Sequence, residues 1–354
     1  MIANASSQSS DASELSPSLD AVTTCVTYFY RVLQSVALVS KRAKIQISSE
    51  GITVSVENSR VVQAHLQLSK PLFTSYIFTP PQPSTLRPTG FGSPVENVTP
   101  ECYTFGISLA RLVECFQIFG NDAQDSVIQR QRPKAQSGSV YDTASTAKSF
   151  VGGTCVGKLR YDEPGSPLVL MFDDSGVTTT CEFLTAVDDY EVSDIALQAD
   201  SICTKVIMKA TYLTDVFREL DSAGSDTLTV RSTATPPTLT FICRGDAGSV
   251  EYAFSRDRNT VETFASNEFV QNVYNFKMVV GMAKDAVKLA TKVSLRIDVN
   301  GVMSIQCMCD VGDGRQSFID FRSMPVYDEY DLPSRQTQPG RGVDYSDSSS
   351  DDEY

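Results

Sequence analysis

Apolar positions along this chain follow two periods, and the combination of the two recurs four times. A stretch with helical spacing is accompanied by short stretches in which every second residue is apolar, as expected for half-buried strands. The clearest echo lies between residues 159–162, which read LRYD, and residues 295–298, which read LRID. Internal repetition of this kind predicts a fold that uses one helix-plus-strands unit four times.

Each of the four helical patterns carries one apolar stripe. Roughly a dozen strand-like stretches accompany them, and these alternate instead of running continuously apolar, which favours antiparallel sheets with the helices covering one face. The pattern therefore predicts an α+β fold. The four stripes contain Phe29, Leu33, Val36 and Val39; Leu109, Leu112, Val113 and Phe116; Leu213, Val216, Phe217 and Leu220; and Phe276, Val279, Val280, Ala283, Val287 and Ala290.

Shifts in composition suggest the domain organisation. The chain has 354 residues, enough for two domains that each bury a core. A Pro-rich loop at residues 79–100 and a mobile insertion at residues 121–153 are expected within the first of them. The predicted segments are a disordered arm at residues 1–20, a first domain at 21–185, a connector at 186–200, a second domain at 201–327 and an acidic disordered tail at 328–354.

The net charge of −13 argues against indiscriminate binding to nucleic acid. The charge is unevenly placed, however. Residues 31–327 carry 32 acids and 28 bases, so most of the excess lies in the two terminal segments. The folded part could therefore still present a basic face.

Several classes of site are excluded by residue types that are scarce. His65 is the only histidine, so a histidine-based metal cluster is excluded, and because His65 sits in a strand pattern we expect no Ser-His-Asp triad, metal or cofactor. The nine cysteines form no C-x-x-C pair and indicate buried thiols in a reducing compartment. No apolar run is long enough for a membrane span, and the first residues lack the pattern of a signal peptide.

Two segments resemble a known family. Residues 43–66 are similar to the opening of sliding clamps, and residues 105–120 are closer to one branch of them, the Rad-one subunit of the nine-one-one checkpoint clamp, a relative of proliferating cell nuclear antigen. Residues 190–192 and 252–256 fit the same branch. The resemblance covers about residues 22–330, and the insertion and the Pro-rich loop depart from a minimal clamp.

This resemblance implies a DNA-clamp fold, with the helices on the inner face of a ring and the sheets outside. It implies a heterotrimer with two other clamp-like subunits around duplex DNA. A clamp loader, checkpoint and repair proteins as partners, and a nuclear location are also implied. The chain would then be a non-enzymatic subunit that acts by enclosing DNA.

A lysine stripe on the fourth predicted helix is the strongest candidate for contact with DNA. Lys277, Lys284 and Lys288 are spaced seven and four residues apart, so they share one helix face. Lysine suits a sliding contact, because a mobile point charge can follow a phosphate backbone without reading its sequence. The alternative is an ordinary solvated helix face. Weaker candidates are Lys209 and Arg218 on the third helix and Arg31, Lys41 and Arg42 around the first.

Two strand-like stretches are candidates for the subunit interface. Clamp subunits join by pairing edge strands, and the matching edges here would lie near residues 177–184 and 249–254. Ring closure would remove edges that otherwise invite aggregation. The candidate interface residues are Val177, Thr179, Cys181, Val250, Tyr252 and Phe254.

Two other functions stay open on the sequence alone. The first is a metal-dependent 3′–5′ DNA exonuclease on the same fold, which needs several carboxylates converging on metal ions. The acids here fall mostly at predicted turns, where they are ordinary turn formers. The second is a protein-interaction scaffold without DNA contact. The acids considered are Asp173, Asp174, Asp188, Asp189, Asp310 and Asp313.

The acidic tail contains possible phosphorylation sites. Ser348, Ser349 and Ser350 each have an acid three residues later, as an acidophilic kinase prefers. Added phosphate would extend the negative tail and repel DNA or recruit a basic partner. The alternative is an unmodified tail that keeps the chain in solution.

Overall fold

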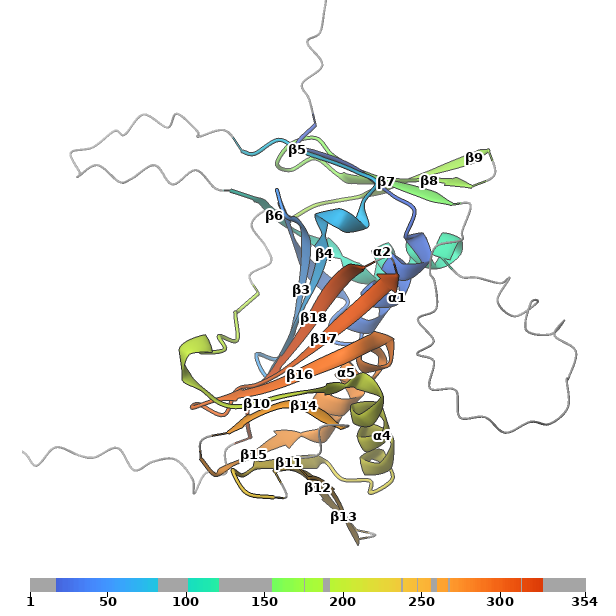
Figure 1. Cartoon of the computed structure of the whole chain (residues 1–354). Helices are drawn as coiled ribbons and strands as arrows, with labels where there is room; N and C mark the ends of the chain where they lie inside the picture. Colours follow the sequence, from blue (N-terminus) through green and yellow to red (C-terminus); the bar gives the residue numbers. More distant parts are fainter. Residues whose placement is uncertain are drawn as a thin grey trace, which may run out of the picture.

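A computed structural model gives the fold shown in Figure 1. The structure describes residues 17–81, 101–120, 155–186 and 192–326, apart from residues 175, 237, 247, 256–259, 267 and 313. The predicted insertion and the acidic tail with Ser348, Ser349 and Ser350 lie outside the described residues, as do residues 1–16 of the predicted arm.

The largest of three antiparallel sheets has nine strands and joins the two halves of the chain. Its order is β14-β10-β16-β17-β18-β4-β3-β2-β6, so β18 pairs with β4 at the junction between the halves. Its strands are β2 (Arg42–Ser48), β3 (Gly51–Asn58), β4 (Val62–Ser69), β6 (Tyr103–Ser108), β10 (Ile202–Lys209), β14 (Val261–Ser266), β16 (Ala290–Asp298), β17 (Met303–Gly312) and β18 (Arg315–Ser323).

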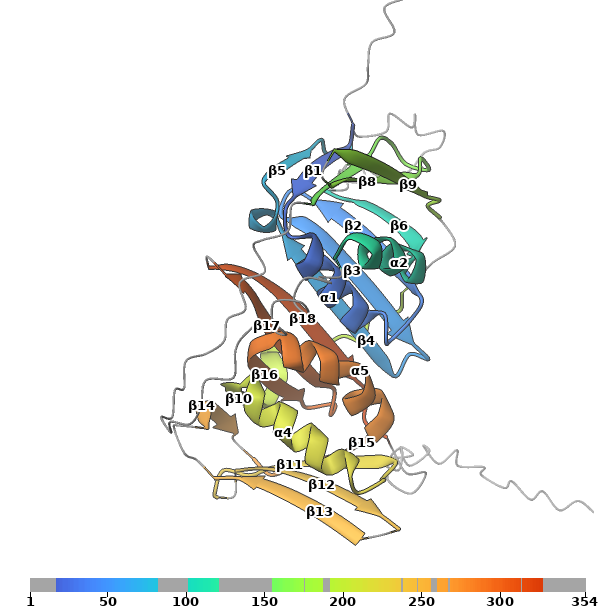
Figure 2. The ribbon, with the colours of Figure 1, turned by 90° about the vertical axis from the view of Figure 1, so that its right-hand side faces the viewer.

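A smaller sheet lies at each end of the molecule (Figures 1 and 2). The five-stranded sheet has the order β5-β1-β7-β8-β9, and the four-stranded sheet has the order β13-β12-β11-β15. Their strands are β1 (Leu19–Thr23), β5 (Ser75–Phe78), β7 (Val156–Tyr161), β8 (Leu168–Asp174) and β9 (Val177–Phe183); and β11 (Thr227–Ser232), β12 (Leu239–Gly245), β13 (Gly248–Phe254) and β15 (Val270–Asn275).

All four described α-helices lie on one side of the sheets (Figure 2). They contact one another in the order α2, α1, α5, α4. The predicted α+β fold with helices on one face is thereby confirmed. The helices are α1 (Val26–Val36), α2 (Leu109–Gly120), α4 (Ala210–Asp221) and α5 (Phe276–Leu289), and two short 3₁₀ turns are η1 (Lys70–Leu72) and η2 (Ala199–Ser201).

Helix α5 shows how the sequence sets this arrangement. Asn275 caps its start, because the Asn275 side chain accepts a hydrogen bond from the backbone N–H of Met278 at 3.0 Å. Val279, Val280 and Ala283 are buried against the sheets, which leaves the opposite side of the helix exposed. The lysines of α5 occupy that exposed side.

The sequence repeat is visible in the strand order. The central sheet contains five strands from the second half of the chain, in the order β14, β10, β16, β17, β18. It continues with four strands from the first half, in the order β4, β3, β2, β6. The separate end sheets contain the same numbers, five and four. The LRYD stretch ends β7, with Asp162 just after it, and the LRID stretch ends β16; each of these strands is the third of a five-stranded set.

The structure adds strands that the sequence pattern did not indicate. Strand β1 begins at Leu19, so the predicted arm at residues 1–20 extends too far. Strands β5, β14 and β15 were also not predicted. Each of these strands has only four to six residues, too few for an alternating pattern to stand out.

The connector is fixed to the outer side of the sheet, away from the helices (Figure 1). Arg322 on β18 bonds the Asp194 carboxylate at 3.0 Å and the carbonyl of Ile195 at 2.9 Å. The backbone N–H of Ile195 donates to the buried Gln63 side chain at 2.7 Å. His65 lies beside this cluster, with Nε2 at 3.6 Å from Asp194 and Nδ1 at 2.9 Å from the Ser55 hydroxyl.

His65 should make the stability of the fold depend on pH. Burial, and then the positive charge of Arg322, lower the pKa of His65 below its usual value of 6.5. Because the folded state disfavours the protonated ring, the contribution of His65 to stability is present above pH 6.5 and is lost as the pH falls through the folded-state pKa. We expect His65→Gln to flatten this part of the pH profile, measured by urea unfolding between pH 7.5 and 5.0. Identical profiles for the two proteins would contradict this assignment.

Candidate nucleic-acid interface

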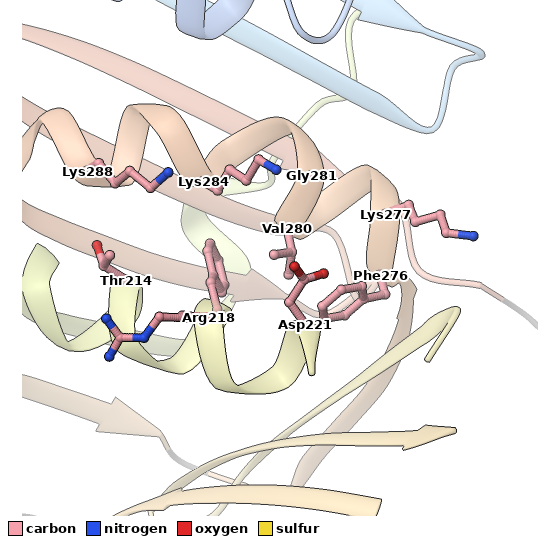
Figure 3. Close-up of a pocket in the computed structure, with 10 residues that line it drawn as sticks. Thr214, Arg218, Asp221, Phe276, Lys277, Val280, Gly281, Lys284 and Lys288 are labelled. Atoms are coloured by element: carbon pink, nitrogen blue, oxygen red, sulfur yellow. The ribbon is translucent and has the colours of Figure 1, made fainter. Parts of the chain in front are cut away.

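A groove between α4 and α5 contains the most concentrated positive charge on the helical face (Figure 3). Its volume is about 470 Å³. Phe217, Phe276 and Val280 form an apolar floor of mostly buried side chains. Around this floor stand the charged side chains Arg218, Asp221, Lys277, Lys284 and Lys288, together with Thr214 and Gly281.

The three lysines share the exposed side of α5, as their spacing predicted. Figure 3 shows Lys284 and Lys288 above the groove, with Arg218 of α4 across from them. Lys277 stands at the start of α5 and points outward. Two helices therefore place four cations around one groove.

Three of these cations have carboxylate neighbours at the surface. Lys277 Nζ lies 2.9 Å from Asp226, and this hydrogen bond and charge raise the pKa of Lys277. The other two pairs are Lys288 with Asp285 at 3.0 Å and Arg218 with Asp215 at 2.8 Å. Such exposed pairs contribute little to stability, because water and salt compete for both partners, and a phosphate can replace the carboxylate. For Lys284, the described residues offer no carboxylate at ion-pair distance.

Of the weaker sequence candidates, Arg218 lines this groove, whereas Lys209, Arg31, Lys41 and Arg42 do not. The prediction that Lys209 lies on the third helix is wrong, because Lys209 is the last residue of β10. Arg31 is half-buried on α1, and the exposed residues Lys41 and Arg42 lie just before β2 and at its first position. Arg111 on α2 pairs with Glu114, at 2.8 Å.

The helical face as a whole is close to neutral. The four described helices carry six bases and five acids, in a chain whose net charge is −13. Helix α5 holds three of the bases and one of the acids, so α5 is the basic element of this face. The six bases are Arg31, Arg111, Arg218, Lys277, Lys284 and Lys288, and the five acids are Glu114, Asp215, Glu219, Asp221 and Asp285.

Sequence spacing could have predicted two of the three carboxylates that pair with the cations of the groove. Asp215 and Asp285 each stand three residues before their basic partner, a helical spacing that predicts contact. Asp226 lies far from Lys277 in the chain and meets it only because the segment before β11 reaches the start of α5, where Phe276 donates to the carbonyl of Asp226. Nothing local in the sequence signals that pair.

The two predicted interface stretches form end strands of the two small sheets. Strand β9 pairs only with β8, and β13 pairs only with β12, among the described strands. Both show the same sequence of exposed, half-buried and buried positions. Val177 and Leu184 at the β9 edge are 66% and 89% exposed. The two edges lie at opposite ends of the molecule (Figures 1 and 2).

The remaining sequence candidates are dispersed. Asp173 and Asp174 lie at the end of β8, and Asp310 accepts a hydrogen bond from the backbone N–H of Gly312 at 2.8 Å, as turn residues do. Asp188, Asp189 and Asp313 lie outside the described residues. Within the described ranges, no three His, Cys, Asp or Glu side chains gather as metal ligands would. In the same ranges, no helix has the length and hydropathy needed to cross a membrane.

Comparison with known proteins identifies the architecture. The family model described as Repair protein Rad1/Rec1/Rad17 matches residues 18–309. This chain belongs to that family. The match spans most of both halves and the connector between them, so the resemblance to the checkpoint branch of the sliding clamps is confirmed.

Curated relatives and a solved structure agree with this membership. The Rad1-family chain is 27% identical over 308 residues to DNA damage checkpoint control protein rad1 of Schizosaccharomyces pombe, covering 86% of each chain. It is 25% identical over 278 residues to Cell cycle checkpoint protein RAD1 of Mus musculus, covering 78% of this chain and 82% of the relative. The crystal structure of proliferating cellular nuclear antigen from Entamoeba histolytica has the same fold, with a TM-score of 0.61, 14% identity and coverage of 88% of this chain and 100% of that one.

The exposed ion pairs of α5 should be dispensable for folding. We expect the triple variant Lys277→Ala, Lys284→Ala, Lys288→Ala of this Rad1-family chain to melt within about 3 °C of the parent, because all three side chains are exposed. Differential scanning calorimetry measures this. A much larger fall in melting temperature would show that the pairs hold α5 in place.

Proposed function

We propose that this chain is one subunit of a closed heterotrimeric ring that encircles duplex DNA at sites of damage. The observation that carries the proposal is the pair of incomplete sheets at opposite ends. A five-stranded sheet ends at β9 and a four-stranded sheet ends at β13, whereas the same five and four are joined into one nine-stranded sheet in the middle of the chain. A neighbouring clamp-like subunit at each end would complete both.

The exposed edges support this assembly. An unpaired edge strand presents a row of free backbone N–H and C=O groups and is open to pairing with another chain. Because the ends differ, each contact is between unlike surfaces, and such contacts close into rings when the rotation between subunits permits. Two other clamp-like subunits would fill the remaining places.

The helical face supports contact with DNA. In a ring closed through β9 and β13, the four helices would line the hole, and the cations around the α5 groove would face the phosphates. Enclosure keeps the ring on DNA, so the lining needs only to offset phosphate charge. A nearly neutral face with one basic helix suits a ring that slides.

The outer face would serve partner proteins. The sheets and the connector lie away from the helices, where checkpoint and repair proteins could dock while DNA occupies the hole. The names of the relatives in Schizosaccharomyces pombe and Mus musculus, checkpoint control and cell cycle checkpoint proteins, support this role. A clamp loader to open the ring, a nuclear location and the absence of enzymatic activity belong to the same proposal.

The lysines of α5 provide a test of the DNA contact. We expect the triple alanine variant, assembled with its partner subunits, to bind linear duplex DNA more weakly than the parent at a given salt concentration, on a duplex whose free ends let the ring slide off. The plot of log affinity against log salt should flatten by about two to three units, because three phosphate contacts are lost.

A control variant removes the same charge elsewhere. Lys158, Lys205 and Lys292 lie on strands β7, β10 and β16, not on the helices. Replacing these three with alanine should leave the salt dependence unchanged. Equal behaviour of the two triple variants would remove the α5 lysines from the proposed lining.

The edge strands provide a test of the ring. We expect Thr178→Pro on β9 and Ala253→Pro on β13, at positions whose backbone N–H points away from the neighbouring strand of the same sheet, each to lose one neighbour and to keep the other, since proline removes a backbone donor that the partner strand needs. Edge strands tolerate proline, so the fold itself should survive. Native mass spectrometry of the assembled complex identifies the subunit lost. Loss of the same neighbour from both variants, or of none, would contradict closure through these edges.

A further inference from the structure

The junction inside the chain shows how two sheet edges of this fold meet. Strand β18 pairs with β4 in antiparallel register, with Ile319 opposite Leu66 and Phe321 opposite Ala64. These four side chains are buried. Between them, Asp320 lies opposite His65 and Arg322 opposite Gln63, on the side that carries the connector. The junction thus has an apolar row and a polar row.

The repeat places β9 in the position of β18. Leu159 and Leu295 are the first residues of the echoed stretches. From Leu159, the strand pairing runs through Leu170 on β8 to Cys181 on β9. From Leu295, it runs through Ile305 on β17 to Phe321 on β18. Cys181 is therefore the counterpart of Phe321, and Thr180 is the counterpart of Asp320.

The repeat also places β13 in the position of β4. Ser108 immediately precedes α2 and lies opposite Arg42 on β2. Asn275 immediately precedes α5 and lies opposite Thr227 on β11. Three residues after Arg42, Ile45 pairs with Val54 on β3, which pairs with Leu66 on β4. Three residues after Thr227, Val230 pairs with Phe241 on β12, which pairs with Tyr252 on β13. Tyr252 is therefore the counterpart of Leu66, and Glu251 is the counterpart of His65.

These equivalences give the register at an interface between two chains. The position of Thr180 would face the position of Glu251, and the position of Glu182 would face that of Ser249. Thr179, Cys181, Val250 and Tyr252 are half-buried and would form the apolar row. Thr180, Glu182, Ser249 and Glu251 are exposed and would form the polar row.

The polar row shows what β13 requires of its partner. Inside the chain, Arg296 reaches past Ser304, on the strand between, to Asp320, with contacts of 2.9 Å and 3.4 Å. Asp320 itself lies one diagonal step from Ser304, because the residue directly opposite Ser304 is Arg322. On β12, Arg244 stands opposite Ser249, as Arg296 stands opposite Ser304. Arg244 can therefore reach past Ser249 to a carboxylate on a partner strand, while Glu251 forms no ion pair within the described residues and offers a carboxylate to a base.

We propose that β13 selects an edge strand that carries a lysine or arginine opposite Glu251 and a carboxylate two residues later, opposite Ser249. This inference rests on the proposed ring and specifies one of its neighbours by chemistry. A second copy of this chain supplies the carboxylate, Glu182, but has Thr180 where the base belongs. The lack of a base at residue 180 disfavours pairing of the chain with itself.

The test supplies the missing base on the chain itself. We expect Thr180→Lys to lower the dissociation constant for self-association about three-fold or more, measured by sedimentation equilibrium of the isolated chain, because an opposite-charge pair facing across strands is favourable. Thr178→Lys adds the same charge on the same exposed side, one row away, and should leave the constant near that of the parent. The double variant Thr180→Lys, Glu251→Lys should have a dissociation constant no lower than that of the parent, because two like charges then face each other across the strands.

Every other result counts against the inference. Equal association of Thr180→Lys and Thr178→Lys, or no association of any variant up to about 1 mM, would overturn the register and the charge rule. The proline variants separate this failure from failure of the ring. If Thr178→Pro and Ala253→Pro each still remove a different neighbour, the ring stands and only the register is wrong. If they do not, both proposals fall.

Discussion

Backbone pairing between β18 and β4 is the interaction on which the rest of the structure depends. It joins the two halves into one nine-stranded sheet, and the buried apolar residues of both halves form one continuous cluster. It also sets the helices of both halves side by side, with α1 next to α5. Without this pairing the helices would form two separate pairs, and the molecule would have no continuous face to turn toward a ligand.

Polar contacts reinforce that junction from the outer side. Arg322 holds the connector at Asp194 and Ile195, and Gln63 accepts from the connector backbone within the buried region. The segment that links the halves is therefore tied across the seam that it spans. Any motion that opens the seam has to break these bonds together with the strand pairing.

Local patterns in the sequence predicted the helices and their buried sides, and the LRYD and LRID echo marked strands that hold equivalent places. The shared side of Lys277, Lys284 and Lys288 followed from helical spacing alone. Strands as short as β1 and β5 could not be predicted, because four or five residues do not define a period. The groove beside α5 and the Asp226 contact were also beyond prediction, since both depend on segments brought together only by the tertiary fold.

The two ends of the molecule differ in chemistry as well as in strand number. One end offers Glu182 and no described arginine beside it, and the other offers Arg244 and Glu251. In the proposed ring, subunits joined head to tail through such unlike ends would give an assembly that is polar along its axis. Its two flat sides would be different surfaces, and DNA passing through the hole would meet them in a defined sequence.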